Sequence, residues 1–327
     1  MVKGFWATLP KPIFVLAPLA GVTDAAFRFI IAKYGKPDVM YTEFTSADGL
    51  CSRGRKAILI DLAYSEGERP IVAQLFGSNP ENMEQACCLV RELGFDAIDI
   101  NMGCPDKGIE RQGAGAAHIK NPKLAQEIIA AAIRGAQHLP VSVKTRIGYS
   151  KNTLDEWLPY LLEMQLAAIV VHGRTRKEMS KVPAHWDAIG RAVELRDKYD
   201  SSDGHTLILG NGDVQDLDEA RQKVAQHGVD GVMIGRGIFG NPWRFNTQKK
   251  IEDLPLQTRL GVMLEHSKLF EELYKKDLPD EKRKKPFDLM KKHFKAYVNG
   301  FEGAKELRVK LMETNNAQEV EEIVRGF

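Results

Sequence analysis

A cysteine at the end of a predicted strand is the residue of this chain best placed for chemistry. The run 97–100 is followed directly by Asn101, Met102, Gly103, Cys104 and Pro105. Parallel α/β folds keep their reactive groups at the carboxyl ends of the strands. Gly103 permits a sharp turn and Pro105 stiffens the exit, so we expect Cys104 at the mouth of a site. The alternative is a buried, unreactive cysteine.

Other predicted strands also end on polar residues. These residues are Gln74, Lys144 with Arg146, and His172 with Arg174. A lysine inside an apolar barrel strand is unfavourable unless an anion compensates its charge. Lys144 therefore predicts an electron-rich ligand. A structural salt bridge from Lys144 to a buried carboxylate such as Glu43 or Asp99 is the alternative.

Two glycine-rich turns follow the last two predicted strands. Gly210-Asn211-Gly212-Asp213 ends one and Gly235-Arg236-Gly237 ends the other. In a barrel of alternating strands and helices, these are the positions where backbone N–H groups and an arginine hold a phosphate. A lysine deep in the barrel together with this phosphate site indicates flavin mononucleotide (FMN), with its ring at Lys144 and its phosphate tail at Arg236.

Short β-branched runs that alternate with amphipathic stretches position these groups. Eight runs are predicted as strands: 13–20, 39–47, 70–77, 97–103, 141–148, 168–175, 207–213 and 231–237. The stretches 82–93, 122–137 and 216–227 between them have the start signals of helices. Eight such units predict an α/β fold, a closed (β/α)8 TIM barrel.

The alternation stops after Phe239, and the pattern is helical from about Leu254 onward. Prolines and polar residues between Asn241 and Pro255 mark the junction. We therefore predict two domains, a catalytic TIM barrel at 1–245 and a second, all-helical domain at 246–327.

Composition limits the function classes. The 327 residues are 43% hydrophobic and carry a formal net charge of +2, which excludes a uniformly basic nucleic-acid coat but not a local basic patch. Four cysteines without a CxxC pair or metal-ligand spacing favour a reducing, cytoplasmic setting. The apolar stretch 13–20 is too short to span a bilayer and contains Pro18, so no membrane association is expected.

Signature blocks spread over the whole chain resemble those of the tRNA-dihydrouridine synthases. In the barrel these blocks are APLAGVTD (17–24), QLFG (74–77), NMGCP (101–105), GAGA (113–116), SVKTR (142–146), HGRTR (172–176) and GNGD (210–213). In the helical region, MKKHF (290–294) and GAKELR (303–308) resemble the tRNA-binding domain of that family. The resemblance implies an FMN enzyme that reduces the C5–C6 double bond of selected uridines in tRNA, with NADPH as reductant.

The resemblance also implies residue roles. Asn101 positions the uracil, and Cys104 is the general acid that protonates C5 after hydride from flavin N5 reaches C6. The cofactor-binding residues are Pro18, Leu19, Gln74, Lys144, His172, Asn211, Gly212, Asp213, Gly235 and Arg236. Compared with many relatives, the stretch 106–112 is less basic, and we read His118 as a packing variation.

The RNA contacts are expected from the helical domain and the barrel rim. Lys291, Lys292 and Arg308 are the main candidates in the domain, and Arg174 and Arg176 are the candidates at the rim. The domain also offers cations and interleaved aromatic residues: Lys282, Arg283, Lys284, Lys285, Lys295, Lys305, Lys310, Phe287, Phe294 and Tyr297. Cations beside aromatics suit nucleic acid, whereas the alternative is an ordinary solvated amphipathic helix.

Two other functions compete with the tRNA-uridine reductase. A flavin barrel acting on a free pyrimidine, such as a dihydroorotate dehydrogenase, also uses a cysteine or serine at a strand end, but it does not need the helical domain. A non-catalytic RNA-binding protein would leave Lys144 buried without its ligand. We expect a monomer, because one chain supplies a complete site, and no obligate protein partner.

Overall fold

A computed structural model describes residues 3–199, 205–274 and 285–327 of the chain. Its centre is a parallel sheet in the order β1-β9-β8-β7-β6-β5-β4-β2, with β3 also paired to β4. The strands are β1 (Ile13–Leu16), β2 (Met40–Tyr41), β3 (Thr45–Ser46), β4 (Ile71–Phe76), β5 (Ala97–Met102), β6 (Val141–Arg146), β7 (Ala168–His172), β8 (Leu207–Asn211) and β9 (Gly231–Ile234). The N–H of Leu16 donates to the carbonyl of Val39 at 3.1 Å, which joins β1 to the second strand and closes the barrel.

Each predicted run contains a strand that ends before the run does, and one run is divided in two. The run 39–47 forms two short strands, β2 and β3, because both pair with β4 but the chain leaves the ladder between them. Thr42 lies in this gap, and its hydroxyl accepts the N–H of Gln74 at 3.1 Å. A side chain thus replaces part of the backbone pairing here.

Helices surround the sheet as predicted. The main ones are α1 (Ala25–Tyr34), α4 (Pro80–Glu92), α6 (Pro122–Ala136), α7 (Leu154–Leu162), α8 (Trp186–Tyr199) and α9 (Leu217–His227), and shorter ones are α2 (Ala47–Leu50), α3 (Arg55–Ile58) and α5 (Lys107–Arg111). Of the predicted start residues, Asp216 caps α9 and Pro122 is the first residue of α6, whereas α4 begins two residues before the predicted Asn82. The side chains of Asn79 and Asn121, which were not predicted as caps, accept backbone N–H groups in the first turns of α4 and α6.

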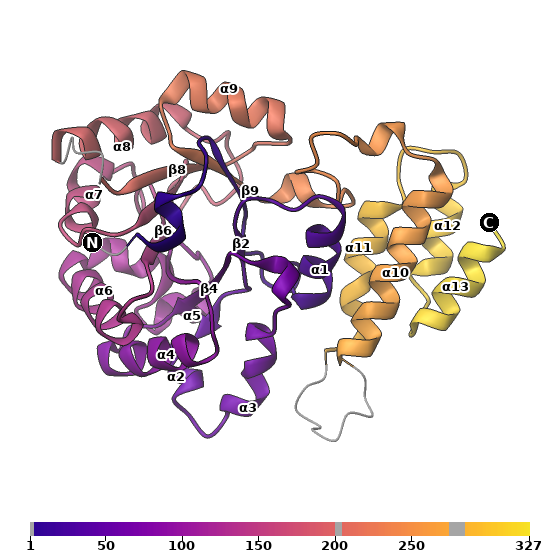
Figure 1. The fold of residues 1–327 in the computed structure, drawn as a ribbon, viewed down its shortest axis with the longest axis horizontal. Coiled ribbons are helices and arrows are strands. Elements are labelled where there is room, and N and C mark those ends of the chain that lie inside the picture. Colours follow the sequence, from indigo (N-terminus) through magenta and orange to yellow (C-terminus); the bar gives the residue numbers. More distant parts are fainter. Residues whose placement is uncertain (1–2, 200–204, 275–284) are drawn as a thin grey trace.

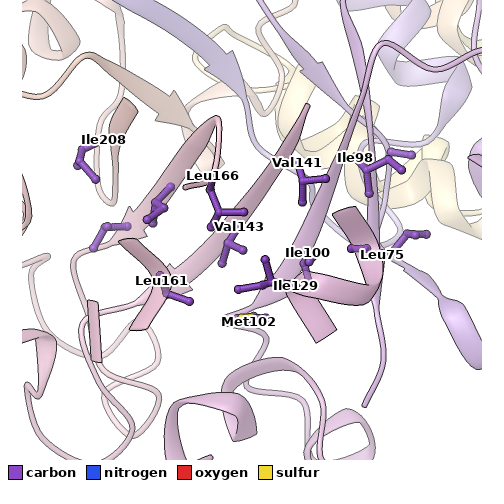
Figure 2. Close-up of a cluster of buried hydrophobic side chains, with 14 of the residues drawn as sticks. Leu75, Ile98, Ile100, Met102, Ile129, Val141, Val143, Leu161, Leu166 and Ile208 are labelled. Carbon is purple, nitrogen blue, oxygen red and sulfur yellow. The ribbon is translucent and has the colours of Figure 1, made fainter. Parts of the chain in front are cut away.

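The period-two pattern of each strand decides which side chains face the site. On β5, Ile98, Ile100 and Met102 point outward and pack in the layer that includes Ile129 of α6 (Figure 2). The alternate residues, Asp99 and Asn101, therefore face the barrel interior. On β6 the same alternation sends Val141 and Val143 outward, and Ser142, Lys144 and Arg146 inward.

Four helices follow the barrel: α10 (Leu256–Tyr274), α11 (Met290–Tyr297), α12 (Ala304–Leu311) and α13 (Ala317–Arg325). They share a core that includes Met263, Phe270, Phe294 and Leu311. Figure 1 shows them beside α1, on the side of the barrel away from α6 and α7. The predicted change from alternating to all-helical structure is confirmed, with α10 beginning two residues after Leu254.

Polar contacts join the two parts beside the barrel mouth. Lys285 donates to Glu43 at 2.6 Å and lies 2.9 Å from Asp61. Glu43 in turn accepts the N–H of Gly21. Among the described residues, no helix has the length and apolar character needed to cross a membrane.

Candidate active site

A cavity of about 320 Å³ opens at the carboxyl ends of the strands. Its size lies within the range of small-ligand pockets. Most of the residues predicted to act together line it: Pro18, Leu19, Asn101, Cys104, Lys144, His172, Arg174, Asn211, Gly212, Asp213, Gly235 and Arg236. The barrel thus brings residues that are up to 218 positions apart into one site.

Lys144 has no bonded counter-ion in the part of the chain that the structure describes. Glu43, one partner considered for it, is bound to Lys285, so a Lys144–Glu43 salt bridge is wrong. Asp99 accepts hydrogen bonds from Gln74 and Ser142. Burial, reinforced by the Arg146 charge, lowers the pKa of Lys144 from 10.5 to about 8. Burying a charged lysine without a counter-ion is unfavourable, so Lys144 fits the anionic, electron-rich ligand predicted from the sequence.

The outer part of the cavity is positively charged. Asp213 forms salt bridges with both Arg174 and Arg236, so one carboxylate is shared by two guanidinium groups. Burial, together with Lys144, Arg146, Arg174 and Arg236, lowers the pKa of His172 well below 6.5. His172 is therefore neutral at physiological pH and available as a hydrogen-bonding group. The excess of cations fits a phosphate at the ends of β8 and β9, as FMN requires.

Cys104 lies in the wall of this cavity, which excludes the buried, unreactive alternative. Its N–H donates to Asn101 Oδ1 at 2.8 Å, and its carbonyl accepts the N–H of Ala116 at 3.0 Å. Gly115 has a φ of +61°, and a Cβ there would lie 2.8 Å from the Cys104 carbonyl oxygen. The second glycine of GAGA thus permits the close contact that supports the turn at Gly103-Cys104-Pro105, which we call the cysteine loop. Burial raises the pKa of the Cys104 thiol, so it keeps its proton near neutral pH.

Two of the site residues predicted in the barrel lie outside the cavity lining. Gln74 is fully buried beneath the cavity, where its amide is bonded to Asp99 and Asn101. Arg176 lies outside the cavity lining, forms a salt bridge with Glu110 and stacks on Tyr149. Arg176 therefore braces α5, the helix that follows Cys104, and Gln74 takes part in the internal support of the site.

Arg146 is a cavity residue that the sequence indicated only indirectly. Its Nε donates to the Gly103 carbonyl at 2.7 Å and its Nη1 donates to the Thr175 carbonyl at 3.2 Å, beside Cys104. Burial lowers the pKa of Arg146 to about 10. The signal was the period of two on β6, because residues 144 and 146 face the same side of a strand.

The C-terminal helices place their predicted RNA contacts unevenly. Lys291 forms a salt bridge with Asp288, and Arg308 donates to the Val298 carbonyl at 2.6 Å. Lys292 reaches back to the barrel, with its Nζ beside Gly21. Lys295, Lys305 and Lys310 are exposed. Lys282, Arg283 and Lys284 lie outside the described residues.

The interleaved aromatics of these helices are not a nucleic-acid surface. Phe294 and Tyr297 are buried in the helical core, and Phe287 packs against it. Lys285 forms salt bridges with Glu43 and Asp61, so its charge is paired within the protein and not presented to RNA. The reading of an ordinary amphipathic helix is correct for these residues. Exposed cations instead lie in the segments that follow β5, β6 and β7 at the barrel mouth, α5 included, at Lys107, Arg111, Lys120, Lys151, Lys177 and Lys181.

Comparison with known proteins gives the family. Residues 15–326 match the family described as dihydrouridine synthase (Dus). The chain is 40% identical over 329 residues to the "Probable tRNA-dihydrouridine synthase 2" of Bacillus subtilis, covering 100% of this chain and 97% of that protein. It is also 40% identical over 331 residues to a "Probable tRNA-dihydrouridine synthase" of Staphylococcus epidermidis, with the same coverage.

A solved structure supports the fold alone. It is the 6-hydroxypseudooxynicotine amine oxidase of Pseudomonas geniculata, which is 11% identical and has a TM-score of 0.51 over 71% of this chain and 46% of its own. The matched family spans both the barrel and the C-terminal helices, and each signature block lies within it. The chain therefore belongs to the dihydrouridine synthase family.

Proposed function

We propose that this protein reduces the C5–C6 double bond of selected uridines in tRNA, using FMN and NADPH. The observation that carries the proposal is the joint placement, in one cavity of a dihydrouridine synthase barrel, of a protonated thiol and a lysine that lacks a bonded counter-ion. In this proposal residues 1–245 hold the cofactor and residues 246–327 dock the tRNA. The protein acts in the cytoplasm as a monomer.

The cavity residues divide into a ring part and a phosphate part. Lys144 on β6 and His172 on β7 line the cavity and hold the flavin ring in this proposal, together with Pro18 and Leu19. The phosphate is held by the turns at the ends of β8 and β9, with residues Asn211, Gly212, Asp213, Gly235 and Arg236. When bound, the reduced flavin supplies a hydride to C6 of the uracil.

Cys104 completes the reduction by donating its proton to C5. Hydride addition at C6 leaves an electron pair on the C4–C5 side of the ring, and a proton is needed there to give the saturated product. An acid for this step must still carry its proton at the working pH. The raised pKa of the Cys104 thiol meets this condition.

The substrate has to leave its stack to reach this depth. A base in folded RNA is flipped out into such a pocket, which is easiest in loops and at the tRNA elbow. Lys291, Lys292 and Arg308 of the C-terminal helices, together with the exposed cations of the mouth, attract and orient the phosphate backbone. Arg174, predicted as a rim contact, is buried and bonded to Asp213, so it acts inside the cavity.

A spectroscopic test separates this proposal from reduction of a free pyrimidine. The purified protein, loaded with FMN and reduced by NADPH without oxygen, is mixed with tRNA lacking dihydrouridine or with orotate. We expect tRNA to reoxidise the flavin with formation of dihydrouridine, and orotate to have no effect. Reoxidation by orotate alone would contradict the proposal.

A further inference from the structure

A chain of buried hydrogen bonds runs beneath the cavity to the cysteine loop. Ser142 Oγ donates to Asp99 Oδ1 at 2.6 Å, and Gln74 Nε2 donates to Asp99 Oδ2 at 2.7 Å. Asn101 Nδ2 donates to Gln74 Oε1 at 2.9 Å. Asn101 Oδ1 then accepts the N–H groups of Gly103 at 3.1 Å and of Cys104 at 2.8 Å.

Three neighbouring strands hold this chain in register. Gln74 on β4 is the direct partner of Asp99 on β5, and Asp99 is the direct partner of Ser142 on β6. Gln74, Asp99 and Ser142 are fully buried, and Asn101 is 6% exposed. Water therefore does not compete for these bonds, and a break leaves a buried polar group unsatisfied.

The direction of every bond is fixed from both ends. The N–H groups of Gly103 and Cys104 are donors only, so Asn101 must turn its oxygen toward them and its nitrogen toward Gln74. Gln74 must then present its oxygen to Asn101 and its nitrogen to residue 99. An ionised Asp99 is an acceptor only, so it matches this last donor. The acceptor at position 99 thereby fixes the orientation of the side-chain amides of Gln74 and Asn101.

We propose that Asp99 is a positioning residue for the general acid, acting through the amides of Gln74 and Asn101, which we call the amide relay. The relay holds the backbone of Cys104 at the cavity wall and leaves one Nδ2 hydrogen of Asn101 for the substrate. Gln74, predicted as a cofactor contact, acts as a link in this chain. The inference rests on the proposed function, since it concerns the proton that Cys104 delivers.

Substitutions at position 99 test the acceptor. Asp99→Leu removes it at similar size, whereas Asp99→Asn keeps an oxygen for Gln74 and lets its nitrogen donate to the Ser142 hydroxyl. We expect Asp99→Leu to lower kcat for tRNA reduction by about 100-fold, the size of effect that a misplaced reacting group produces. Asp99→Asn should lower it by less than about tenfold, the equivalent of one neutral hydrogen bond.

A charge swap tests the direction of the bonds. Gln74→Glu keeps the shape of the side chain but places a second carboxylate against Asp99. Above a pH of about 8 the two carboxylates no longer share a proton and repel each other, so the variant should lose activity there. Adding Asp99→Asn restores a donor facing an acceptor at each link. The kcat of the double variant should be at least about tenfold higher than that of Gln74→Glu alone.

Readouts other than turnover separate positioning from folding. In Asp99→Leu, flavin content, the rate of flavin reduction by NADPH and KM for tRNA should stay unchanged, while the rate of Cys104 alkylation, followed by peptide mass spectrometry, changes. Thr45→Val is the matched control: Thr45 lies on the strand beside Gln74 and its buried hydroxyl has no hydrogen-bond partner among the described residues. This control should behave as wild type.

The outcomes are distinct. Wild-type protein that forms no dihydrouridine would contradict the proposed function itself. The relay would be overturned if Asp99→Leu were as active as the wild type, or if its rate of Cys104 alkylation were unchanged. It would also be overturned if the double variant were no more active than Gln74→Glu alone. Loss of flavin content in step with kcat would also overturn it, because the defect would then lie in cofactor binding.

Discussion

Replacement of Lys144 by methionine is expected to stabilise the flavin-free protein while abolishing its tight binding of FMN. Lys144→Met keeps the aliphatic stem and removes the ammonium group. In the part of the chain that the structure describes, that group makes no hydrogen bond or salt bridge, and its pKa is lowered from 10.5 to about 8 by burial and then by Arg146. The charge therefore opposes folding until an anionic ligand arrives.

The lowered pKa of Lys144 gives the size and the pH dependence of its effect on the free energy of unfolding. A shift of this size corresponds to roughly 3.5 kcal/mol at most, since each pKa unit is worth about 1.4 kcal/mol. The unfolded chain keeps the Lys144 proton up to pH 10.5, whereas the folded chain releases it near pH 8. Stability of the wild type therefore rises with pH across this window, and below it the full penalty is present.

Urea unfolding of the flavin-free proteins measures the difference. Near neutral pH, Lys144→Met should be the more stable protein by up to roughly 3.5 kcal/mol, and the gap should close at a pH of about 10.5. FMN should stabilise the wild type by mass action and stabilise the variant far less. A variant that is less stable than wild type without flavin, or that binds FMN equally well, would refute the reasoning.

Three further predictions follow from the site and the junction. Cys104→Ala should retain FMN and its reduction by NADPH but slow tRNA reduction by about 100-fold or more in stopped-flow assays; undiminished turnover would exclude the thiol as the acid. Lys291→Ala with Lys292→Ala should weaken tRNA binding and lower the slope of log K against log salt by roughly one to two, with flavin content unchanged; an unaltered slope would contradict docking on α11. His266 and His293 are buried beside Phe27 without hydrogen-bond partners among the described residues, and burial lowers both pKa values, that of His266 from 6.5 to about 3. Stability should therefore fall as pH drops below 6.5, by up to about 1.4 kcal/mol per histidine and pH unit, and replacing both with leucine should flatten this loss in urea titrations.

The location of the site was predictable because it follows from local patterns. Strand periodicity tells which residues face inward, and a parallel barrel gathers the strand ends at one face. Asn101, Lys144, His172 and Asn211 therefore meet in the cavity as expected. Arg146 follows by the same argument.

The partners of individual charges were not predictable, because they come from distant parts of the chain. Glu110 and Arg176 are 66 positions apart, and Glu43 and Lys285 are 242 positions apart. No periodicity links such pairs, so the sequence predicts Arg176 and Lys285 as RNA contacts and not as salt-bridge partners. Phe294 and Tyr297 likewise pack into a core to which α1, α10, α12 and α13 also contribute residues.

Mapping of dihydrouridine in tRNA tests the central claim most directly. A strain lacking the gene for this protein is complemented with the wild type or with Cys104→Ala, and its purified tRNAs are sequenced by mass spectrometry. We predict that specific uridines lose the modification in the deletion strain, regain it with the wild type, and stay unmodified with the variant. An unchanged dihydrouridine map in the deletion strain, together with no reduction of its tRNA by the purified holoenzyme, would contradict the account.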